Sequence, residues 1–380
     1  MKAAFLALMG TVLASSLYVL WHLWRLTPGS VFKVLVCGLF ILWMASFFVS
    51  FLFLEKVPLE AAFPLYGIGN TWLIAFLYIL MAFVLLDLAS ICHLLPKGFL
   101  KVSWPVLIGV FAVVGLILSL GGIHYHHKYR EEISLTSSKP MERPLTIVMA
   151  SDLHLGYHNR RAELSRWIDL INAENPDLVL FGGDVLDRSL RPVVAGDYAS
   201  EFHRLAAPAY AVLGNHEYYG DIEGAEAFYK DAGITLLKDS FADVSGIRLL
   251  GRNDRSYPCR AALSDIIPVP VVRQAHQPVE GAVPEPVEGP FTILLDHQPS
   301  HLEEAEEAGI DFQFSGHTHR GQVWPISWIT DAIFEKSWGR HQRGSTQYYI
   351  SSGLGIWGAK VRIGTRSEYL VLHVLQEGNL

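Results

Sequence analysis

Five short clusters of Asp, Asn and His residues are the part of the sequence best suited to chemistry. In chain order they contain Asp152 and His154, Asp184 and Asp187, Asn215 and His216, His297, and finally His317 and His319. Imidazole nitrogens combined with carboxylate and amide oxygens, without thiolate, favour manganese, iron or zinc over calcium. The clusters therefore predict a site for divalent metal ions.

Each cluster directly follows an apolar run that reads as a buried β-strand. Asp152 and His154 are two residues apart at such a strand end, so strand alternation would point both side chains into one pocket. A single pair of this kind is more often a solvated surface feature. Five clusters placed in the same way indicate one site, because the loops after successive strands gather at one edge of a layered α/β fold.

The elements that must position these residues begin after residue 143, where we expect an α/β domain over residues 144–380. Strands such as "DLVLFGGD" and "AYAVLGNHE" alternate with helical segments, the first over 161–174. Residues 126–143 are expected to be a polar linker. Residues 268–290 are rich in Pro and repeat "PVEG", which predicts an exposed insertion loop because Pro cannot pair inside a sheet.

The first 125 residues predict a transmembrane region. Apolar stretches at about 3–24, 31–54, 70–95 and 104–123 each approach the ~20 residues that a helix needs to cross a bilayer. We expect four transmembrane helices, although the first stretch could instead be a cleaved signal peptide. Positive charges are densest after the first and third stretches, which favours cytoplasmic loops there and an extracytoplasmic catalytic domain.

Composition excludes some classes of function. The formal net charge of -7 gives no general basic surface, so no nucleic-acid partner is expected. Three cysteines, two of them inside apolar runs, cannot build a disulfide framework or a cysteine-based zinc site.

The ordered motifs D-x-H, G-G-D-x-x-D, G-N-H-E, H-x-P and G-H-T-H resemble those of the calcineurin-like metallophosphoesterase family, in particular its membrane-anchored, YkuE-like bacterial branch. This resemblance covers about residues 145–378. It implies a central β-sandwich flanked by helices, a pair of divalent metal ions and a location in the bacterial plasma membrane. Carried over by position, it assigns Asp152, His154 and His319 to one ion, Asn215, His297 and His317 to the other, Asp184 as the bridge, and His216 to the attacking or leaving oxygen.

Two further residues have expected roles at this site. Asp187, three residues beyond the bridge, is expected to orient His216, which would donate a proton. Arg320, where the branch commonly has Gly, either binds a substrate phosphate or is a solvated loop residue. Glu217 occupies a position where Asp is frequent in the family, and no loss of metal is expected from this difference.

The expected function is hydrolysis of a phosphomonoester or phosphodiester, with a lipid-like substrate because of the membrane anchor. One alternative is a pyrophosphate hydrolase acting on a UDP-2,3-diacylglucosamine type of lipid, which requires a cytoplasmic active site. Another is an inactive membrane scaffold or sensor. The intact set of metal positions favours an enzyme.

Overall fold

The computed structural model describes residues 2–268 and 289–377, and the side chains from residue 10 onward. The chain divides into two compact units, one of residues 1–123 with Gly358–Val361 and one of residues 124–357 with 362–380. Most of the expected Pro-rich insertion, residues 269–288, lies outside the described residues.

The first unit is helical. Its elements are α1 (Lys2–Leu26), α2 (Ser30–Phe53), the short 3-10 helix η1 (Leu54–Lys56), α3 (Leu59–Ile91) and α4 (Trp104–His126). Among the described residues, three segments are long and apolar enough to cross a membrane: Ser30–Lys56, Leu59–Ile91 and Trp104–His126. The expectation that α1 also spans a membrane stays a prediction.

Helix α3 starts at Leu59 and not near residue 70, where its apolar stretch was expected to begin. The additional residues include Pro64 inside the helix. Proline is tolerated in membrane helices where neighbouring groups form hydrogen bonds with the backbone groups that proline leaves unpaired. Gly69 lies against α2, since a Cβ added there would come within 2.9 Å of Phe47 Cα. Small residues of this kind allow the backbones of two apolar helices to approach closely.

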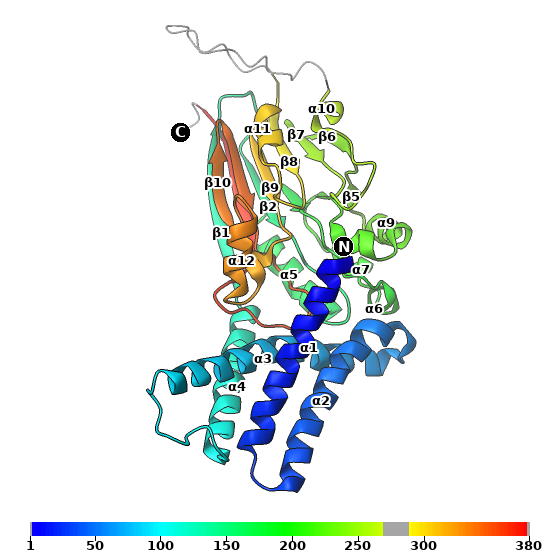
Figure 1. Cartoon of the computed structure of the whole chain (residues 1–380). Helices are drawn as coiled ribbons and strands as arrows, with labels where there is room; N and C mark the ends of the chain where they lie inside the picture. Colours follow the sequence, from blue (N-terminus) through cyan, green and yellow to red (C-terminus); the bar gives the residue numbers. More distant parts are fainter. Residues whose placement is uncertain (1, 269–288, 378–380) are drawn as a thin grey trace. The chain divides into compact units, whose positions relative to one another are not determined.

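The second unit is a sandwich of two six-stranded mixed sheets with helices outside them (Figure 1). The first sheet has the order β1-β12-β2-β3-β4-β5, in which β12 and β2 are antiparallel and the other neighbours parallel. Its strands are β1 (Lys128–Ser137), β2 (Leu145–Ala150), β3 (Leu178–Phe181), β4 (Ala209–Ala211), β5 (Thr235–Leu236) and β12 (Ser367–Gln376).

The second sheet has the order β10-β11-β9-β8-β7-β6, with a parallel centre and one antiparallel pair at each edge. Its strands are β6 (Ser240–Val244), β7 (Ile247–Gly251), β8 (Phe291–Leu295), β9 (Phe312–Ser315), β10 (Gly339–Arg343) and β11 (Thr346–Ile350). Strands β8 and β9 are buried at every position, as expected for strands covered on both faces.

Three apolar cores hold the layers together. Ile147 and Ile293 belong to the core that joins the two sheets. The second core packs helices such as α5 (Arg161–Ala173) and α9 (Ile222–Asp231) on the first sheet, and the third packs α10 (Leu263–Ile266) and α11 (Glu303–Glu307) on the second. The remaining helices are α6 (Arg191–Ala195), α7 (Ala199–Phe202), α8 (Asn215–Tyr219), the 3-10 helix η2 (His319–Gly321) and α12 (Ile326–Ile333).

The segment expected to be a linker contains β1, which pairs along ten residues with β12. Its sequence, KYREEISLTS, is polar because β1 is an edge strand whose side chains are mostly half-buried or exposed. The segment is therefore part of the sandwich, and the short polar stretch that follows the strand leads directly into β2.

Candidate metal centre

The strand ends of both sheets bring the predicted residues together. Asp152 and His154 follow β2, Asp184 and Asp187 follow β3, and Asn215 and His216 begin α8 after β4. His297 follows β8, and His317 and His319 follow β9. Because β2, β3 and β4 are parallel neighbours in one sheet, and β8 and β9 in the other, their carboxyl ends form a common edge.

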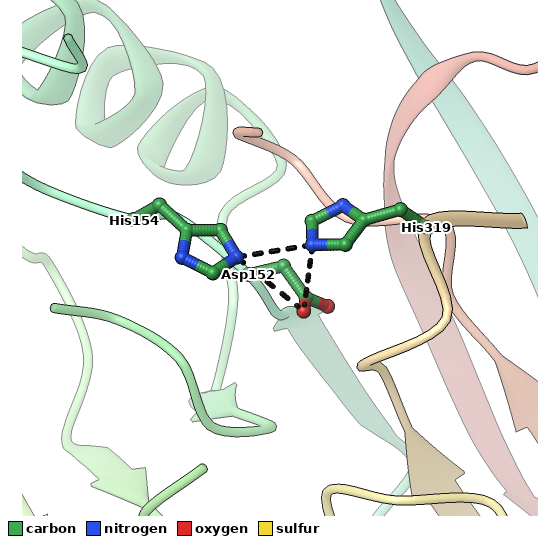
Figure 2. Close-up of side chains that lie close together, drawn as sticks. All are labelled: Asp152, His154 and His319. Atoms are coloured by element: carbon green, nitrogen blue, oxygen red, sulfur yellow. Dashed lines mark hydrogen bonds and ion pairs between the residues drawn. The ribbon is translucent and has the colours of Figure 1, made fainter. Parts of the chain in front are cut away.

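Asp152, His154 and His319 form the first group of possible metal ligands (Figure 2). The two imidazole Nε2 atoms lie 3.0 Å apart, and Asp152 Oδ1 lies 3.4 Å from that of His319 and 3.8 Å from that of His154. All three residues are buried. Their donor atoms face one small volume, an arrangement that suits a single cation.

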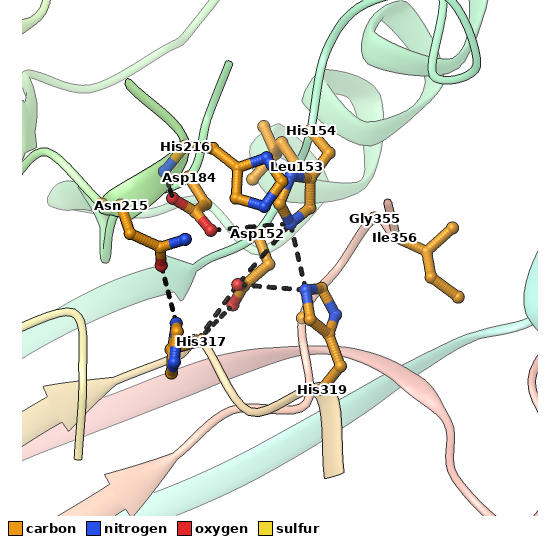
Figure 3. A network of polar contacts seen from close by, with 12 residues as sticks. Asp152, Leu153, His154, Asp184, Asn215, His216, His317, His319, Gly355 and Ile356 are labelled. Carbon is orange, nitrogen blue, oxygen red and sulfur yellow. Dashed lines mark hydrogen bonds and ion pairs between the residues drawn. The ribbon is translucent and has the colours of Figure 1, made fainter. Parts of the chain in front are cut away.

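Asp184, His297 and His317 form the second group. Asp184 Oδ2 lies 3.2 Å from His297 Nε2, and also 3.7 Å from His154 Nε2 of the first group. Asn215 Oδ1 lies 2.7 Å from His317 Nδ1, which adds the amide oxygen to this side of the site (Figure 3). Asp184 Oδ2 thus lies within 3.7 Å of a histidine from each group.

His216 and Asp187 lie beside these groups. His216 Nδ1 is 2.8 Å from Asp187 Oδ1, so the contact expected between these two residues is present. The His216 ring packs edge-on against that of His154, with centroids 4.5 Å apart. His216 is also near enough to His154 and Asp184 to form a third group of possible ligands.

The electrostatics of the first group suit a cation. Burial lowers the pKa of His154 to about 3, and that of His319 well below its usual range, so both imidazoles are neutral. Burial raises the pKa of Asp152 to about 6. Two neutral imidazoles and one carboxylate in a buried site have their lone pairs available for a divalent ion, so these residues fit the metal that the motifs imply.

The second group and His216 are more strongly charged. Burial opposes ionisation of Asp184, but the neighbouring His297 and His216 hold the pKa of its carboxyl well below its usual range. Burial lowers the pKa of His216, but the negative charges of Asp184 and Asp187 outweigh it and raise this pKa to about 9. His216 therefore holds a proton near neutral pH.

Backbone contacts orient the side chains from both sheets. His317 N–H donates to Asp152 Oδ1 at 3.1 Å, and His216 N–H donates to Asp184 Oδ1 at 2.9 Å. His297 Nδ1 lies 2.8 Å from the Gly182 carbonyl oxygen, which directs its Nε2 toward Asp184. A carbonyl partner of this kind fixes the tautomer of a metal-binding histidine.

Two glycines are required by close approach. A Cβ on Gly214 would lie 2.1 Å from Asp184 Oδ1, and one on Gly316 would lie 2.3 Å from Asp152 Oδ2. Neither position tolerates a side chain unless a carboxylate of the site moves. Gly353, farther along the chain, has a φ of +91° and also lies against Asp152.

Two buried ionisable residues, Glu217 and Arg362, support the site without contributing to its expected ligand set. Glu217 accepts hydrogen bonds from Leu186 N–H, Gly214 N–H and the Tyr229 hydroxyl at 2.8–3.0 Å, and burial raises its pKa to about 7. Glu217 thereby joins the loops after β3 and β4.

Arg362, which sequence reasoning missed, supports the loop that carries His319. It is 1% exposed and donates to the carbonyl oxygens of His319, Ser352, Gly353 and Gly355 at 2.5–3.3 Å. Burial lowers its pKa to about 10, so the guanidinium remains charged at neutral pH. The only sequence signal was an arginine inside a mixed apolar segment, "AKVRIG".

Arg320 follows His319 and is half-buried. Its guanidinium carbon lies 4.4 Å from the centroid of the Trp338 ring, a cation–π contact. Arg320 is therefore held against an aromatic face beside the site, and is not a fully solvated loop residue. Its expected contact with a substrate phosphate stays a prediction.

The fold and this cluster define a metal-dependent phosphoesterase domain, and comparison with known proteins identifies its family. The family model of the calcineurin-like phosphoesterases matches residues 145–321. An uncharacterized metallophosphoesterase of Helicobacter pylori strain J99 is 30% identical over 70% of this chain and 70% of its own length. The chain belongs to the calcineurin-like metallophosphoesterase family.

Two other relatives share shorter segments with the chain. A second uncharacterized metallophosphoesterase, from another Helicobacter pylori strain, is 30% identical over 62% of this chain and 61% of its own length. A transmembrane protein with metallophosphoesterase domain from Danio rerio is 30% identical over 59% of this chain and 52% of its own length. The chain thus spans between about half and two thirds of the length of these two relatives.

Proposed function

We propose that this protein hydrolyses a phosphomonoester or phosphodiester with the help of two divalent metal ions of manganese, iron or zinc. The observation that carries the proposal is the position of Asp184 beside two groups of buried or half-buried residues, within 3.7 Å of a histidine from each. Asp152, His154 and His319 would hold one ion, and Asn215, His297 and His317 would hold the other. When bound, the ions supply Lewis acidity and lower the pKa of water.

The chain's own residues orient the substrate and move protons. His216 carries a proton near neutral pH, which it donates from its ring to the leaving oxygen, while Asp187 fixes the ring by its contact with Nδ1. Arg320, held against Trp338, binds a non-reacting phosphate oxygen. Burial of Asp152 and Asp184 limits access of bulk water to the ligands.

The membrane-compatible helices favour a lipid-like substrate and membership of the YkuE-like branch. Positive charge is densest around the connection of α1 to α2, at Arg25 and Lys33, and before α4, at Lys97 and Lys101. This distribution favours an extracytoplasmic domain in a bacterial plasma membrane.

Cysteine placed at exposed Val194, in a chain with Cys37, Cys92 and Cys259 replaced by serine, tests the orientation. An impermeant maleimide applied to intact cells should label it, and lack of labelling there, with labelling after lysis, would reverse the orientation.

The test of activity uses the full chain purified in detergent and loaded with Mn²⁺, Fe²⁺ or Zn²⁺. It is assayed on phosphomonoesters, phosphodiesters and pyrophosphate lipids. We expect Asp184→Asn to lower kcat/KM by about 10³-fold or more together with the metal content, and His216→Ala to lower kcat by about 10²-fold or more with the metal retained. Undiminished activity of Asp184→Asn would refute the two-metal assignment.

A further inference from the structure

Helix α12 presents large apolar side chains to solvent. Trp328, Ile329 and Ile333 are 65%, 54% and 69% exposed, and Trp324, just before the helix, is 39% exposed. Ser327 in the same helix is buried at 6%. A surface helix ordinarily turns its apolar side to the core, so α12 has the reverse arrangement. We call Trp324, Trp328, Ile329 and Ile333 the α12 patch.

The α12 patch is one surface, held in place by contacts on its other side. The rings of Trp324 and Trp328 meet edge to face with centroids 5.4 Å apart. Trp324 N–H donates to Ile363 O at 2.7 Å. The Ser337 hydroxyl, which follows the helix, donates to Asp331 within α12. The exposure of the patch is therefore part of the fold, and a patch of this kind marks an interaction site.

We propose that the α12 patch docks into the interface of a phospholipid bilayer, between the headgroups and the acyl chains. Tryptophan together with aliphatic residues is the composition that membrane interfaces favour. The chain adds a second argument. The candidate span α4 ends at His126 and β1 of the domain begins at Lys128, so a single residue connects them. One residue reaches at most about 3.6 Å. The start of β1 therefore stays tethered close to the end of α4, and so to any bilayer that holds α4.

This docking surface is joined at both ends to the metal centre. Before α12, the chain leaves His319 through η2, and after it Phe334 lies against His317 with ring centroids 6.1 Å apart. The Thr318 hydroxyl donates to Ser337 O at 2.6 Å. Docking of the patch would hold the metal-binding loop beside the phosphate headgroups. This consequence for the substrate rests on the proposed hydrolase function, whereas the docking itself does not.

Lipid contact can be measured without enzymatic activity. The full chain is placed in phosphatidylcholine and phosphatidylglycerol nanodiscs, with Cys37, Cys92 and Cys259 replaced by serine. An environment-sensitive fluorophore is attached at Trp328→Cys or, as the matched control, at Val194→Cys, which is 70% exposed in α6. We expect nitroxide-labelled lipids to quench position 328 about threefold more than the control, with blue-shifted emission.

Two results would overturn the docking proposal. One is quenching at position 328 equal to that at position 194. The other is a blue shift that appears only with two or more copies per disc, without lipid quenching, since this would assign the patch to a contact between copies.

A second measurement separates docking from catalysis. The variant Trp328→Ser/Ile329→Ser/Ile333→Ser should hydrolyse a phosphoester lipid in vesicles about tenfold more slowly than Val194→Ser, with an unchanged rate on a small soluble ester. Equal losses on both substrates would contradict the proposed role in presenting lipid. If the unmodified chain hydrolyses neither substrate, the proposed function fails, while the fluorescence experiment still decides the docking.

Discussion

The contact between His216 and Asp187 gives the sharpest test of the catalytic proposal. Asn in place of Asp187 keeps the shape of the side chain but removes the negative charge 2.8 Å from His216 Nδ1. Asp184 is the strongest of the charges that raise the pKa of His216, and Asp187 adds to it through its hydrogen bond and its charge. Removal of one opposite charge at this distance lowers a histidine pKa by about 1–3, and a change of about 2 moves that of His216 from about 9 to roughly 7.

The expected effect on the rate follows from the protonated fraction of His216. At pH 8 this fraction falls from about 0.9 to about 0.1, so kcat of Asp187→Asn should fall about tenfold, whereas at pH 6 the loss should stay below about twofold. The assay is a profile of kcat from pH 5.5 to 9.5 at saturating metal, with a slow phosphodiester so that chemistry limits the rate.

The control for this prediction is Asp169→Asn, which removes an exposed carboxylate that pairs with Arg204 in the same domain. It should leave the profile unchanged. If Asp187→Asn lowers kcat by the same factor at pH 6 and pH 8, with no movement of the basic limb, then Asp187 only supports the local structure and the proton-donor role of His216 is wrong.

Three further predictions concern the ligands and their supports. Because burial raises the pKa of Asp152 to about 6, its carboxyl is neutral below that pH, and equilibrium dialysis should show less bound metal at pH 5 than at pH 7. Gly214→Ala places a methyl group against Asp184 and should abolish binding of at least one metal ion, as measured by elemental analysis; unchanged metal content would contradict the geometry. Glu217→Ala leaves three buried donors without their acceptor, which costs about 2–4 kcal/mol of folding free energy. Calorimetry should show a Tm lower by about 5–10 °C. A change below about 1 °C would contradict the stabilising role of these hydrogen bonds.

The site could be predicted from sequence because its signal is local. Each ligand follows an apolar run, and parallel neighbouring strands end at one edge, so Asp152, Asp184 and His297 converge whatever the details of the loops. The sequence pattern therefore indicated which residues meet. The contact between His216 and Asp187 was also accessible, because both residues flank expected ligands.

Other features depend on contacts between distant segments and could not be predicted. Strand β1 reads as a polar linker, and its partner β12 lies more than 200 residues later in the chain. Arg362 looks like a surface residue, but it is surrounded by the carbonyl groups of His319 and of the segment 352–355. The exposure of the α12 patch was equally hidden, because apolar residues at helical spacing ordinarily predict a buried face.

The backbone at five of the expected ligands has an unusual conformation. Asp152, His154, Asp184, His317 and His319 all have positive φ values, between 44° and 72°. For a residue other than glycine this conformation costs about 1 kcal/mol, and it persists only where surrounding structure determines it.

Here the determining structure is a set of hydrogen bonds between the loops. Asp152 N–H donates to Gly183 O and His154 N–H to Asp184 O, both within 3.0 Å, while Gly316 N–H donates to His297 O at 2.9 Å. These bonds extend the strand pairing of each sheet into its loops and hold the left-handed turns at the ligands in place.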